Sequence, residues 1–285
     1  MTCTVTELLR SGTEALEQAS ESARLDAELL LGRLLGVSRA GLAARGDEPV
    51  AAGRAQDYRR LIERRLDGAP VAYLTGVREF WSLPLAVSPA VLVPRPETEL
   101  LVELALATLP AGQPASVLDL GTGSGAIAIA LAHERPRDRI VAVDVSPAAL
   151  EVARGNAERL GLPGIEWRLG SWLEAVPSER FDLIVSNPPY VAAADPALAS
   201  LAAEPRLALS PGPSGLEALA AIVDAAPRHL AGAGWLLLEH GERQGADVRG
   251  LLERRGFASI RTQDDLSAKP RVTLGRLNSH SKETP

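Results

Sequence analysis

The sequence predicts two units, a small helical domain followed by a larger α/β domain with a mostly parallel sheet. The chain has 285 residues, which is long enough for one large domain and a small companion. Apolar residues recur at helical spacing through residues 7–66. From residue 115 onward, short apolar strands alternate with helical segments. That alternation is typical of a parallel sheet with helices on both faces.

The first unit is expected to contain helices and no strand. Apolar residues in it recur at helical spacing with charged residues between them, as in Leu25, Leu29, Leu30, Leu34 and Leu35. Glycines and a proline divide the stretch into helices of ordinary length, at Gly36, Gly41, Gly46 and Pro49. Two roles are open for this unit, a stabilising cap and a surface that docks a substrate.

A short connector separates the two units. Residues 80–87 read as a β-hairpin, in which Pro84 fits only at an edge or a turn. After Pro96 the chain returns to a helix at 97–109, with acidic residues in the first turn as the helix dipole favours.

The α/β unit begins after this helix. Its strands are predicted at 116–120, 140–144, 165–169, 181–186 and 234–239, and its helices near 124–133, 147–161, 214–231 and 244–256. Two further strands, 258–262 and 271–277, are joined by a Pro-containing loop that leaves no room for a crossover helix. One of them must therefore run antiparallel.

Composition excludes several classes of protein. With 46% hydrophobic and 23% charged residues, the chain is an ordinary globular protein. It lacks a signal-like start, and no apolar run approaches the roughly 18 residues of a membrane span, so we expect a cytoplasmic protein without membrane contact. A lone Cys3 excludes an internal disulfide. The net charge of -6 argues against stable nucleic-acid binding.

No metal is expected. The four histidines are scattered and show no ligand spacing, at His133, His229, His240 and His280.

A glycine-rich turn follows the first parallel strand. Such a turn lets backbone N–H groups approach a ligand next to a helix N-terminus. The predicted cofactor-binding residues there are Gly121, Thr122, Gly123, Ser124 and Gly125. Asp144 follows nineteen residues after Gly125, at the end of the second strand, where it could bind ribose hydroxyls. The pattern also fits a dinucleotide fingerprint, so an NAD-dependent oxidoreductase stays open.

Asp119 favours a different cofactor. A carboxylate two residues before the first glycine is poorly placed against a pyrophosphate, whereas the cationic S-adenosylmethionine suits it. Trp172, after the third strand, is predicted either to cover the adenine or to serve as a half-buried core aromatic.

The tetrad Asn187-Pro188-Pro189-Tyr190 follows the fourth strand, at the sheet edge where ligands of α/β proteins bind. A planar nitrogen is a poor nucleophile, and its NH₂ hydrogens must be held so that its lone pair points at the methyl group. The Asn187 side-chain oxygen and the Pro188 carbonyl are the predicted acceptors. Tyr190 is predicted to supply a flat face. Adenine N6, guanine N2 and a glutamine amide all fit this arrangement equally well.

Other motifs identify a family. They are PVAYLTG at 70–76, Phe80-Trp81, PRPETE at 94–99, LEHG at 238–241 and RVTLGR at 271–276. With the glycine loop and the tetrad, they closely resemble the HemK/PrmC family of release factor glutamine N5-methyltransferases, from about residue 23 to residue 277. The closing antiparallel strand likewise resembles the seven-stranded, Rossmann-like methyltransferase fold.

The resemblance implies a substrate and a set of site residues. The acceptor would be the glutamine of the Gly-Gly-Gln loop in class I peptide chain release factors. Cofactor-binding residues would be 121–125, Asp144, Trp172 and Asn187, and the glutamine would lie against Asn187, Pro188, Pro189 and Tyr190. Leu92 and Val93 would form an apolar wall. Many methyltransferases have an acidic residue where Ser171 stands, so this chain departs from the usual contact to the adenine amino group.

The resemblance also implies a domain plan. Residues 1–70 would be a substrate-docking helical domain, 71–96 a hairpin connector, 97–278 the methyltransferase domain and 279–285 a disordered tail. The loop at 204–206 is similar to the family's, but Pro213-Ser214-Gly215 departs from it. The alternative functions are an N6-adenine or N2-guanine nucleic-acid methyltransferase, the oxidoreductase, and a non-enzymatic binding module.

Overall fold

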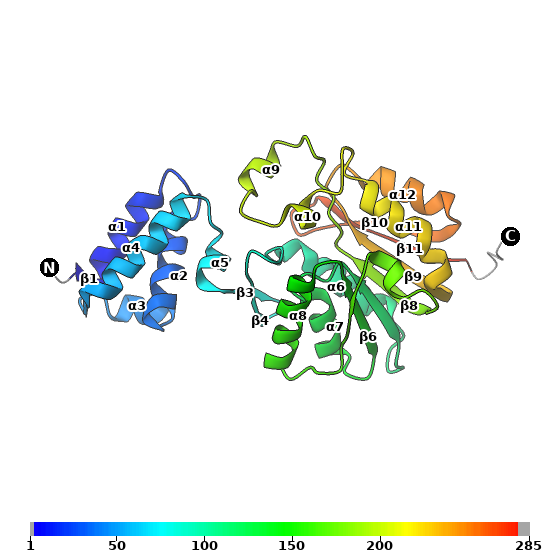
Figure 1. Cartoon of the computed structure of the whole chain (residues 1–285), viewed down its shortest axis with the longest axis horizontal. Coiled ribbons are helices and arrows are strands. Elements are labelled where there is room, and N and C mark those ends of the chain that lie inside the picture. Colours follow the sequence, from blue (N-terminus) through cyan, green and yellow to red (C-terminus); the bar gives the residue numbers. More distant parts are fainter. Residues whose placement is uncertain (1–2, 279–285) are drawn as a thin grey trace. The chain divides into compact units, whose positions relative to one another are not determined.

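The computed structural model describes residues 3–278, so the tail at 279–285 lies outside the described residues. The chain divides into two compact units, Met1–Val77 and Arg78–Pro285 (Figure 1). Each unit has a hydrophobic core of its own.

The first unit is helical. Its helices are α1 (Val5–Leu16), α2 (Ala23–Leu35), α3 (Arg39–Ala44), α4 (Ala52–Leu66) and α5 (Val71–Thr75). Thr4 begins α1 with a capping box, in which Thr4 and Glu7 each bind the other's backbone N–H. Tyr58 from α4 is fully buried and packs so close to Gly12 that a Cβ there would lie 2.1 Å from the tyrosine hydroxyl.

The expectation that residues 7–66 contain no strand was wrong in one place. The two-residue strand β2 (Pro49–Val50) pairs antiparallel with β1 (Cys3–Thr4). The backbone N–H of Val5 donates to the carbonyl of Glu48 just beyond this pair. So short a pairing has no hydrophobic periodicity that a sequence could reveal.

The second unit opens with the hairpin and a helix. Strands β3 (Val77–Phe80) and β4 (Leu83–Ala86) form a two-stranded sheet. Trp81 and Ser82 have φ angles of 53° and 58°, as a tight hairpin turn requires. The chain then passes through η1 (Pro96–Thr98) into α6 (Glu99–Thr108).

The main sheet has seven strands in the order β10-β11-β9-β8-β5-β6-β7. They are β5 (Ser116–Leu120), β6 (Arg139–Asp144), β7 (Glu166–Leu169), β8 (Phe181–Ser186), β9 (Leu230–Glu239), β10 (Phe257–Asp264) and β11 (Pro270–Leu277). Strand β11 inserts antiparallel between β9 and β10, whereas β9, β8, β5, β6 and β7 pair in parallel. The predicted fold class, a seven-stranded methyltransferase sheet preceded along the chain by a helical unit, is confirmed.

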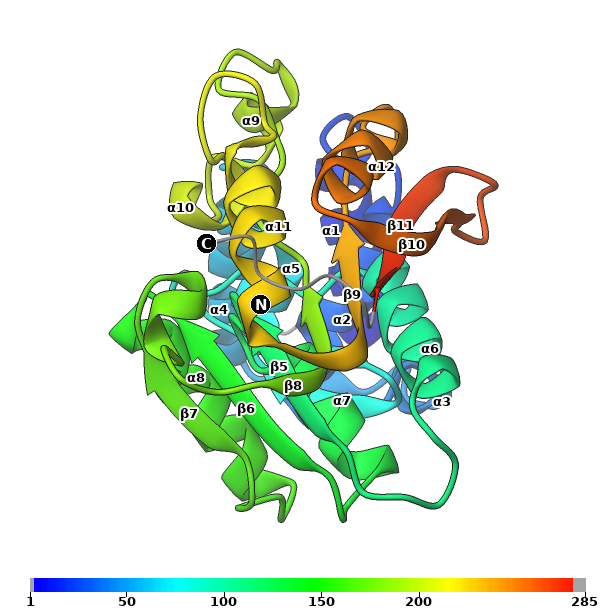
Figure 2. The same ribbon diagram turned by 90° about the vertical axis from the view of Figure 1, so that its right-hand side faces the viewer.

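Helices cover both faces of this sheet (Figure 2). Val117 of β5 belongs to the core shared with α6 and α7 (Ala126–Glu134), to which α8 (Pro147–Arg159) contributes at one edge. Leu118 and Leu120 of β5 belong to the opposite core, with α11 (Glu217–His229) and α12 (Gly245–Arg254). Alternate residues of β5 thus serve opposite faces.

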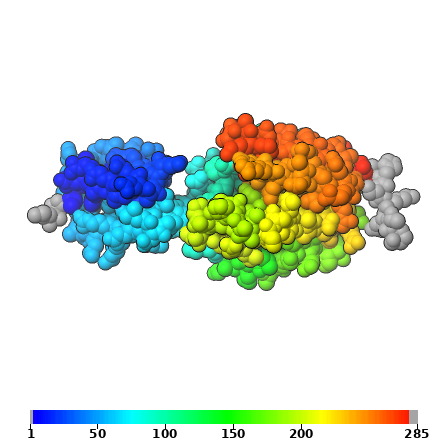
Figure 3. Space-filling view, turned by 90° about the horizontal axis from the view of Figure 1, so that it is seen from above, coloured from blue at the N-terminus to red at the C-terminus, as the bar shows by residue number. Residues whose placement is uncertain are grey.

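Between β8 and α11 the chain forms a long loop at 191–216, which carries the short helices α9 (Ala197–Ser200) and α10 (Arg206–Leu209). The loop emerges at the carboxyl end of β8, and Figure 3 shows its yellow-green part at the surface of the second unit. Within residues 3–278, no helix is both long and apolar enough to cross a membrane. No group of three or more His, Cys, Asp or Glu residues in that range is arranged to hold a metal ion.

Candidate active site

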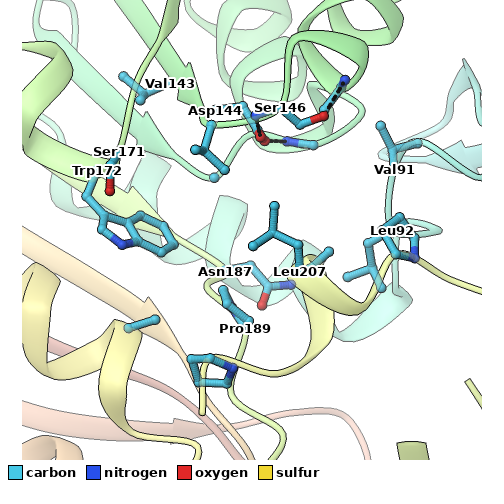
Figure 4. A pocket seen from close by; sticks show the side chains of 18 of the residues that line it. Val91, Leu92, Val143, Asp144, Ser146, Ser171, Trp172, Asn187, Pro189 and Leu207 are labelled. Atoms are coloured by element: carbon cyan, nitrogen blue, oxygen red, sulfur yellow. Dashed lines mark hydrogen bonds between the residues drawn. The ribbon is translucent and has the colours of Figure 1, made fainter.

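A cavity of about 440 Å³ opens at the carboxyl ends of β5, β6, β7 and β8 (Figure 4). Its size falls in the roughly 300–1,000 Å³ range of small-molecule sites. The strand ends contribute the residues Gly121, Gly123, Val143, Asp144, Val145, Ser146, Gly170, Ser171, Trp172, Asn187 and Pro189. Other walls come from residues 90–92, from the loop at 205–211 and from α11.

Glycines at 121, 123 and 125 all have left-handed φ angles, of 73°, 55° and 84°, which other residues adopt only with strain. A Cβ at Gly121 would lie 3.3 Å from the ring of Trp172, whereas one at Gly123 would meet nothing within 4 Å. Gly123 therefore leaves open space beside its Cα, while its N–H is bonded to Asp144. Gly125 is different, because a Cβ there would lie 2.9 Å from Ile129. Gly125 allows α7 to pack.

Asp119 holds the glycine loop and does not line the cavity. It is fully buried, and its Oδ2 accepts hydrogen bonds from the Thr122 hydroxyl (2.7 Å) and the backbone N–H of Ala128 (3.2 Å). Burial raises the pKa of Asp119 to about 7, and the charge of Asp144 adds to the rise. The expectation that Asp119 would face a cationic ligand therefore gives way to a role within the loop.

Asp144 lines the cavity at the end of β6. Its Oδ2 accepts from the backbone N–H of Gly123 (2.8 Å) and its Oδ1 from that of Ser146 (2.9 Å) (Figure 4). Because each carboxylate oxygen has a second lone pair, Asp144 can still accept hydrogen bonds from hydroxyl groups of a ligand.

Trp172 forms one wall of the cavity (Figure 4). Its φ of 46° is unusual for a large side chain and costs on the order of 1 kcal/mol, as is common at functional sites. The ring is half-buried and packs with the core on the α11 side of the sheet. Both expected roles of Trp172 are thus compatible with its position.

The tetrad begins directly after β8. The Asn187 side chain lines the cavity, and its Nδ2 donates to the Thr98 hydroxyl over 3.1 Å. Oδ1 of Asn187 has no hydrogen-bond partner among residues 3–278 and is free to accept one. Pro189 also lines the cavity, whereas Pro188 is buried behind it.

Tyr190 turns away from the cavity lining. Its hydroxyl donates to Oε1 of Glu239 over 3.2 Å, and its backbone carbonyl accepts from Gln244 over 3.1 Å. Burial, together with the charge of Glu239, raises the pKa of Tyr190.

Glu239 at the end of β9 is fully buried behind the tetrad. Burial raises the pKa of Glu239 to about 7, and the Thr98 hydroxyl and the charge of Arg271 partly oppose this rise. Oε2 of Glu239 is buried with no hydrogen-bond partner in the described part of the chain. The next residue, His240, bonds through Nδ1 to the Gly241 carbonyl and through Nε2 to the Thr273 hydroxyl, which fixes the turn.

Glu204 fastens the long loop to the segment before η1. Its carboxylate accepts from the backbone N–H of Val93 (3.0 Å) and from the guanidinium of Arg95 (2.5 Å). Only 3% of the Glu204 side chain is exposed. This ion pair holds Leu207, which is 64% exposed, at the mouth of the cavity.

The comparisons with known proteins agree on one family. A model described as the PrmC N-terminal domain matches residues 7–76, and one described as the methyltransferase small domain matches residues 97–212. The release factor glutamine methyltransferase of Xylella fastidiosa is 50% identical, covering 94% of this chain and 96% of its own. That of Escherichia coli is 47% identical, covering 91% and 94%.

The chain belongs to the release factor glutamine methyltransferase family. The predicted HemK/PrmC membership and the methyltransferase class are therefore confirmed, against the oxidoreductase and the binding module. Solved structures support the fold. A T. thermophilus 16S rRNA guanine-N2 methyltransferase, in complex with AdoMet and guanosine, has a TM-score of 0.54 at 23% identity over 71% of this chain and 50% of that one. A Pyrococcus furiosus methyltransferase has a TM-score of 0.53 at 20% identity over 69% and 89%.

Some of the predicted site residues line the cavity, and others do not. Those that line the cavity are Gly121, Gly123, Asp144, Trp172, Asn187, Pro189 and Leu92. Those that do not are Thr122, Ser124, Gly125, Pro188, Tyr190 and Val93. Thr122, Ser124, Pro188 and Val93 are buried, so they are placed to support the lining.

Sequence reasoning did not single out several residues of the site. Leu207 and Glu217 line the cavity from elements that follow the tetrad. Thr98, Glu204 and Glu239 lie behind the lining. The only available signal was that the last three lie in segments that resemble the family.

Proposed function

We propose that this enzyme transfers a methyl group from S-adenosylmethionine to the side-chain amide nitrogen (N5) of the glutamine in the Gly-Gly-Gln loop of class I peptide chain release factors. It would act in the cytoplasm, in support of translation termination. The observation that carries the proposal is the Asn187 amide, whose Nδ2 is engaged by Thr98 while Oδ1 remains free at the cavity. The relatives' names supply the substrate class.

The cavity suits the cofactor. Gly123 leaves open space beside its Cα, Asp144 offers free lone pairs, and Trp172 presents an aromatic wall. When bound, S-adenosylmethionine supplies an electrophilic methyl group on a cationic sulfur. In this proposal Gly121, Gly123, Asp144 and Trp172 bind it directly. Thr122, Ser124 and Gly125 shape the loop, and no metal takes part.

The tetrad would orient the acceptor. An amide nitrogen is a weak nucleophile because its lone pair is delocalised, so positioning contributes most of the rate. Oδ1 of Asn187 and the carbonyl of Pro188 would each accept one N–H of the glutamine amide. The proline rings fix φ and so fix the direction of that carbonyl. Pro189 and the apolar Leu92 would confine the planar group, with Tyr190 packed behind them, and the displaced proton would pass to water.

The helical unit at 1–70 is proposed to help dock the release factor. Residues 71–96 would connect it to the methyltransferase domain at 97–278. No stable binding to nucleic acid is part of the proposal.

The test supplies methyl-labelled S-adenosylmethionine with a release factor, the same factor with its loop glutamine replaced by alanine, and duplex DNA. We expect label on the unmodified factor alone. Label on the mutant factor or the DNA, with none on the unmodified factor, would contradict the proposal and favour the nucleic-acid alternative.

Asn187→Ala tests the role of the tetrad. Turnover should fall at least 10²-fold, as on loss of other transition-state hydrogen bonds, while calorimetric binding of S-adenosylhomocysteine stays within about threefold. Asn278→Ala is the matched control, because the Asn278 side chain bonds only to the carbonyl of Gly256, at the far end of β11. Near-normal turnover in Asn187→Ala would show that the acceptor amide is held elsewhere.

A further inference from the structure

Asn187 can serve as an acceptor only if its amide is the right way round. An Asn side chain presents an oxygen on one side and an NH₂ on the other, and a 180° rotation exchanges them at almost no change in shape. The proposed chemistry needs the oxygen toward the substrate NH₂. With the amide reversed, two NH₂ groups would face each other. Some neighbouring group must therefore distinguish the two orientations.

Thr98 is the neighbour that contacts the amide. Its hydroxyl lies 3.1 Å from Nδ2 of Asn187, and only 4% of the residue is exposed. A hydroxyl can accept as well as donate, so Thr98 alone would tolerate either end of the amide. The direction depends on where the hydroxyl proton of Thr98 points.

The carboxylate of Glu239 is the candidate acceptor for the hydroxyl proton of Thr98. Thr98 and Glu239 each bond to a residue of the tetrad, Thr98 to Asn187 and Glu239 to Tyr190, and the Thr98 hydroxyl favours the charged form of the Glu239 carboxyl. Oε1 of Glu239 is taken by Tyr190, whereas Oε2 is buried without a hydrogen-bond partner in residues 3–278. A carboxylate only accepts. If the Thr98 hydroxyl donates to Glu239, its lone pairs remain for an N–H of Asn187, and Oδ1 cannot take that place.

We propose that Thr98 and Glu239 are positioning residues that set the orientation of the Asn187 amide and so make the site specific for an NH₂ acceptor. This inference rests on the proposed function of the tetrad. It gives a role to two motifs that the cofactor and acceptor sites do not use, PRPETE around η1 and LEHG at the end of β9. These motifs meet behind the tetrad, one contributing Thr98 and the other Glu239.

Neighbouring groups partly offset the burial that raises the pKa of Glu239 to about 7. Arg271 from β11 favours its charged form, Glu97 from η1 opposes it, and Tyr190 donates to it. Protonation of Glu239 would remove the acceptor for Thr98 and relax the choice of amide orientation. The rate of methyl transfer should therefore fall on the acid side of the Glu239 pKa.

The experiment compares Thr98→Val, which removes the hydroxyl at nearly constant volume, with Thr98→Ser, which keeps it. In Thr98→Val, kcat should fall about 10- to 100-fold, the range expected for a misplaced catalytic group. The KM for the release factor and the affinity for S-adenosylhomocysteine should change by less than about threefold. Thr98→Ser should restore most of kcat. The matched control is Thr108→Val in α6, whose hydroxyl bonds only to the carbonyl of Ala105, and its kcat should match wild type.

A second readout does not depend on turnover. The side-chain NH₂ resonances of Asn187, assigned by their loss in Asn187→Ala, should shift in Thr98→Val and return in Thr98→Ser. Unshifted resonances, or a Thr98→Val enzyme with kcat within threefold of wild type, would overturn the inference. If wild-type enzyme leaves the release factor unlabelled, the proposed function is refuted. The Asn187 resonances still test the inference, because they can be measured without turnover.

Glu239→Gln tests the role of Glu239 separately from that of Thr98. The Gln amide would offer an N–H to Thr98, so the Asn187 orientation should be lost and kcat should fall. If Glu239 acts through Thr98, the double variant Thr98→Val/Glu239→Gln should be no slower than the slower single variant. Tyr190→Phe removes the hydrogen bond from Tyr190 to Glu239. Its effect on kcat shows how much of the loss in Glu239→Gln comes from that bond. Independent, multiplying effects of the two substitutions would overturn the link between them.

Discussion

Replacing Asp119 with Asn should change how the stability of the protein depends on pH. Burial raises the pKa of Asp119 to about 7 from its ordinary 3.8. Because the folded-state value lies above the unfolded one, the contribution of Asp119 to stability is complete below about pH 4 and is lost as pH rises toward 7. A difference of about three pKa units at about 1.4 kcal/mol each corresponds to about 4 kcal/mol.

The substitution isolates this effect. Asn keeps an oxygen that can accept from Thr122 and Ala128, as Oδ2 of Asp119 does now. Its NH₂ replaces Oδ1, which is buried without a partner among the described residues. That exchange adds an offset that does not vary with pH, and the other ionisable groups cancel between the two proteins. The free energy of unfolding of Asp119→Asn relative to wild type should therefore rise by about 4 kcal/mol between pH 4 and pH 8.

Urea unfolding of the two ligand-free proteins at four pH values between 4 and 8 measures this difference. The rise should occur between pH 4 and pH 7 and level off above pH 7. A difference that stays constant within about 1 kcal/mol over the whole range would show that Asp119 is not held in a desolvated position.

Two further predictions concern the loop at 191–216 and the glycine turn. Glu204→Gln should weaken the contact with Arg95 and lower the free energy of unfolding by about 1–3 kcal/mol. It should also speed proteolysis within residues 191–216, and equal cleavage rates in wild type and variant would contradict this. Gly125→Ala and Gly123→Ala should differ, because only a Cβ at Gly125 meets a neighbour, Ile129 at 2.9 Å. The first should lose more than about 2 kcal/mol of stability, and the second should mainly lose affinity for S-adenosylhomocysteine in calorimetry; the reverse pattern would refute the assigned roles.

Strand boundaries could be read from the sequence where burial and turn residues coincide. The predicted strands at 116–120 and 181–186 match β5 and β8, because each is an apolar run that ends at a glycine or a proline turn. Strand β9 was predicted to begin at 234 but begins at Leu230. Gly232 and Ala233 read as a turn, and the structure accommodates them with a φ of 65° at Ala233 and an irregular register against β8. Pairing within the sheet overrides the local preference there.

Some residues of the site could likewise be predicted from the sequence, and others could not. Gly121, Asp144 and Asn187 could be predicted because each follows a recognisable strand, and the carboxyl ends of parallel strands meet at one edge. Glu204 could not be paired with Arg95, which lies 109 residues earlier. Thr98 and Glu239 could not be paired either, because their meeting depends on how η1 and β9 pack behind the tetrad. Such contacts between distant segments leave no local pattern.

The choice between a glutamine and a nucleobase must then lie in the walls around the tetrad, because all three candidate acceptors present the same NH₂ to Asn187. Leu92 and Leu207 lie near Asn187 in the cavity (Figure 4) and offer apolar surface. The methylene groups of a glutamine side chain can pack there without loss. The ring nitrogens and carbonyls of a nucleobase would be left without hydrogen-bond donors, at a cost of about 1–3 kcal/mol for each buried group. Replacing Leu207 with Asn should therefore reduce the preference for the release factor over a free nucleoside, and an unchanged preference would place the selection elsewhere.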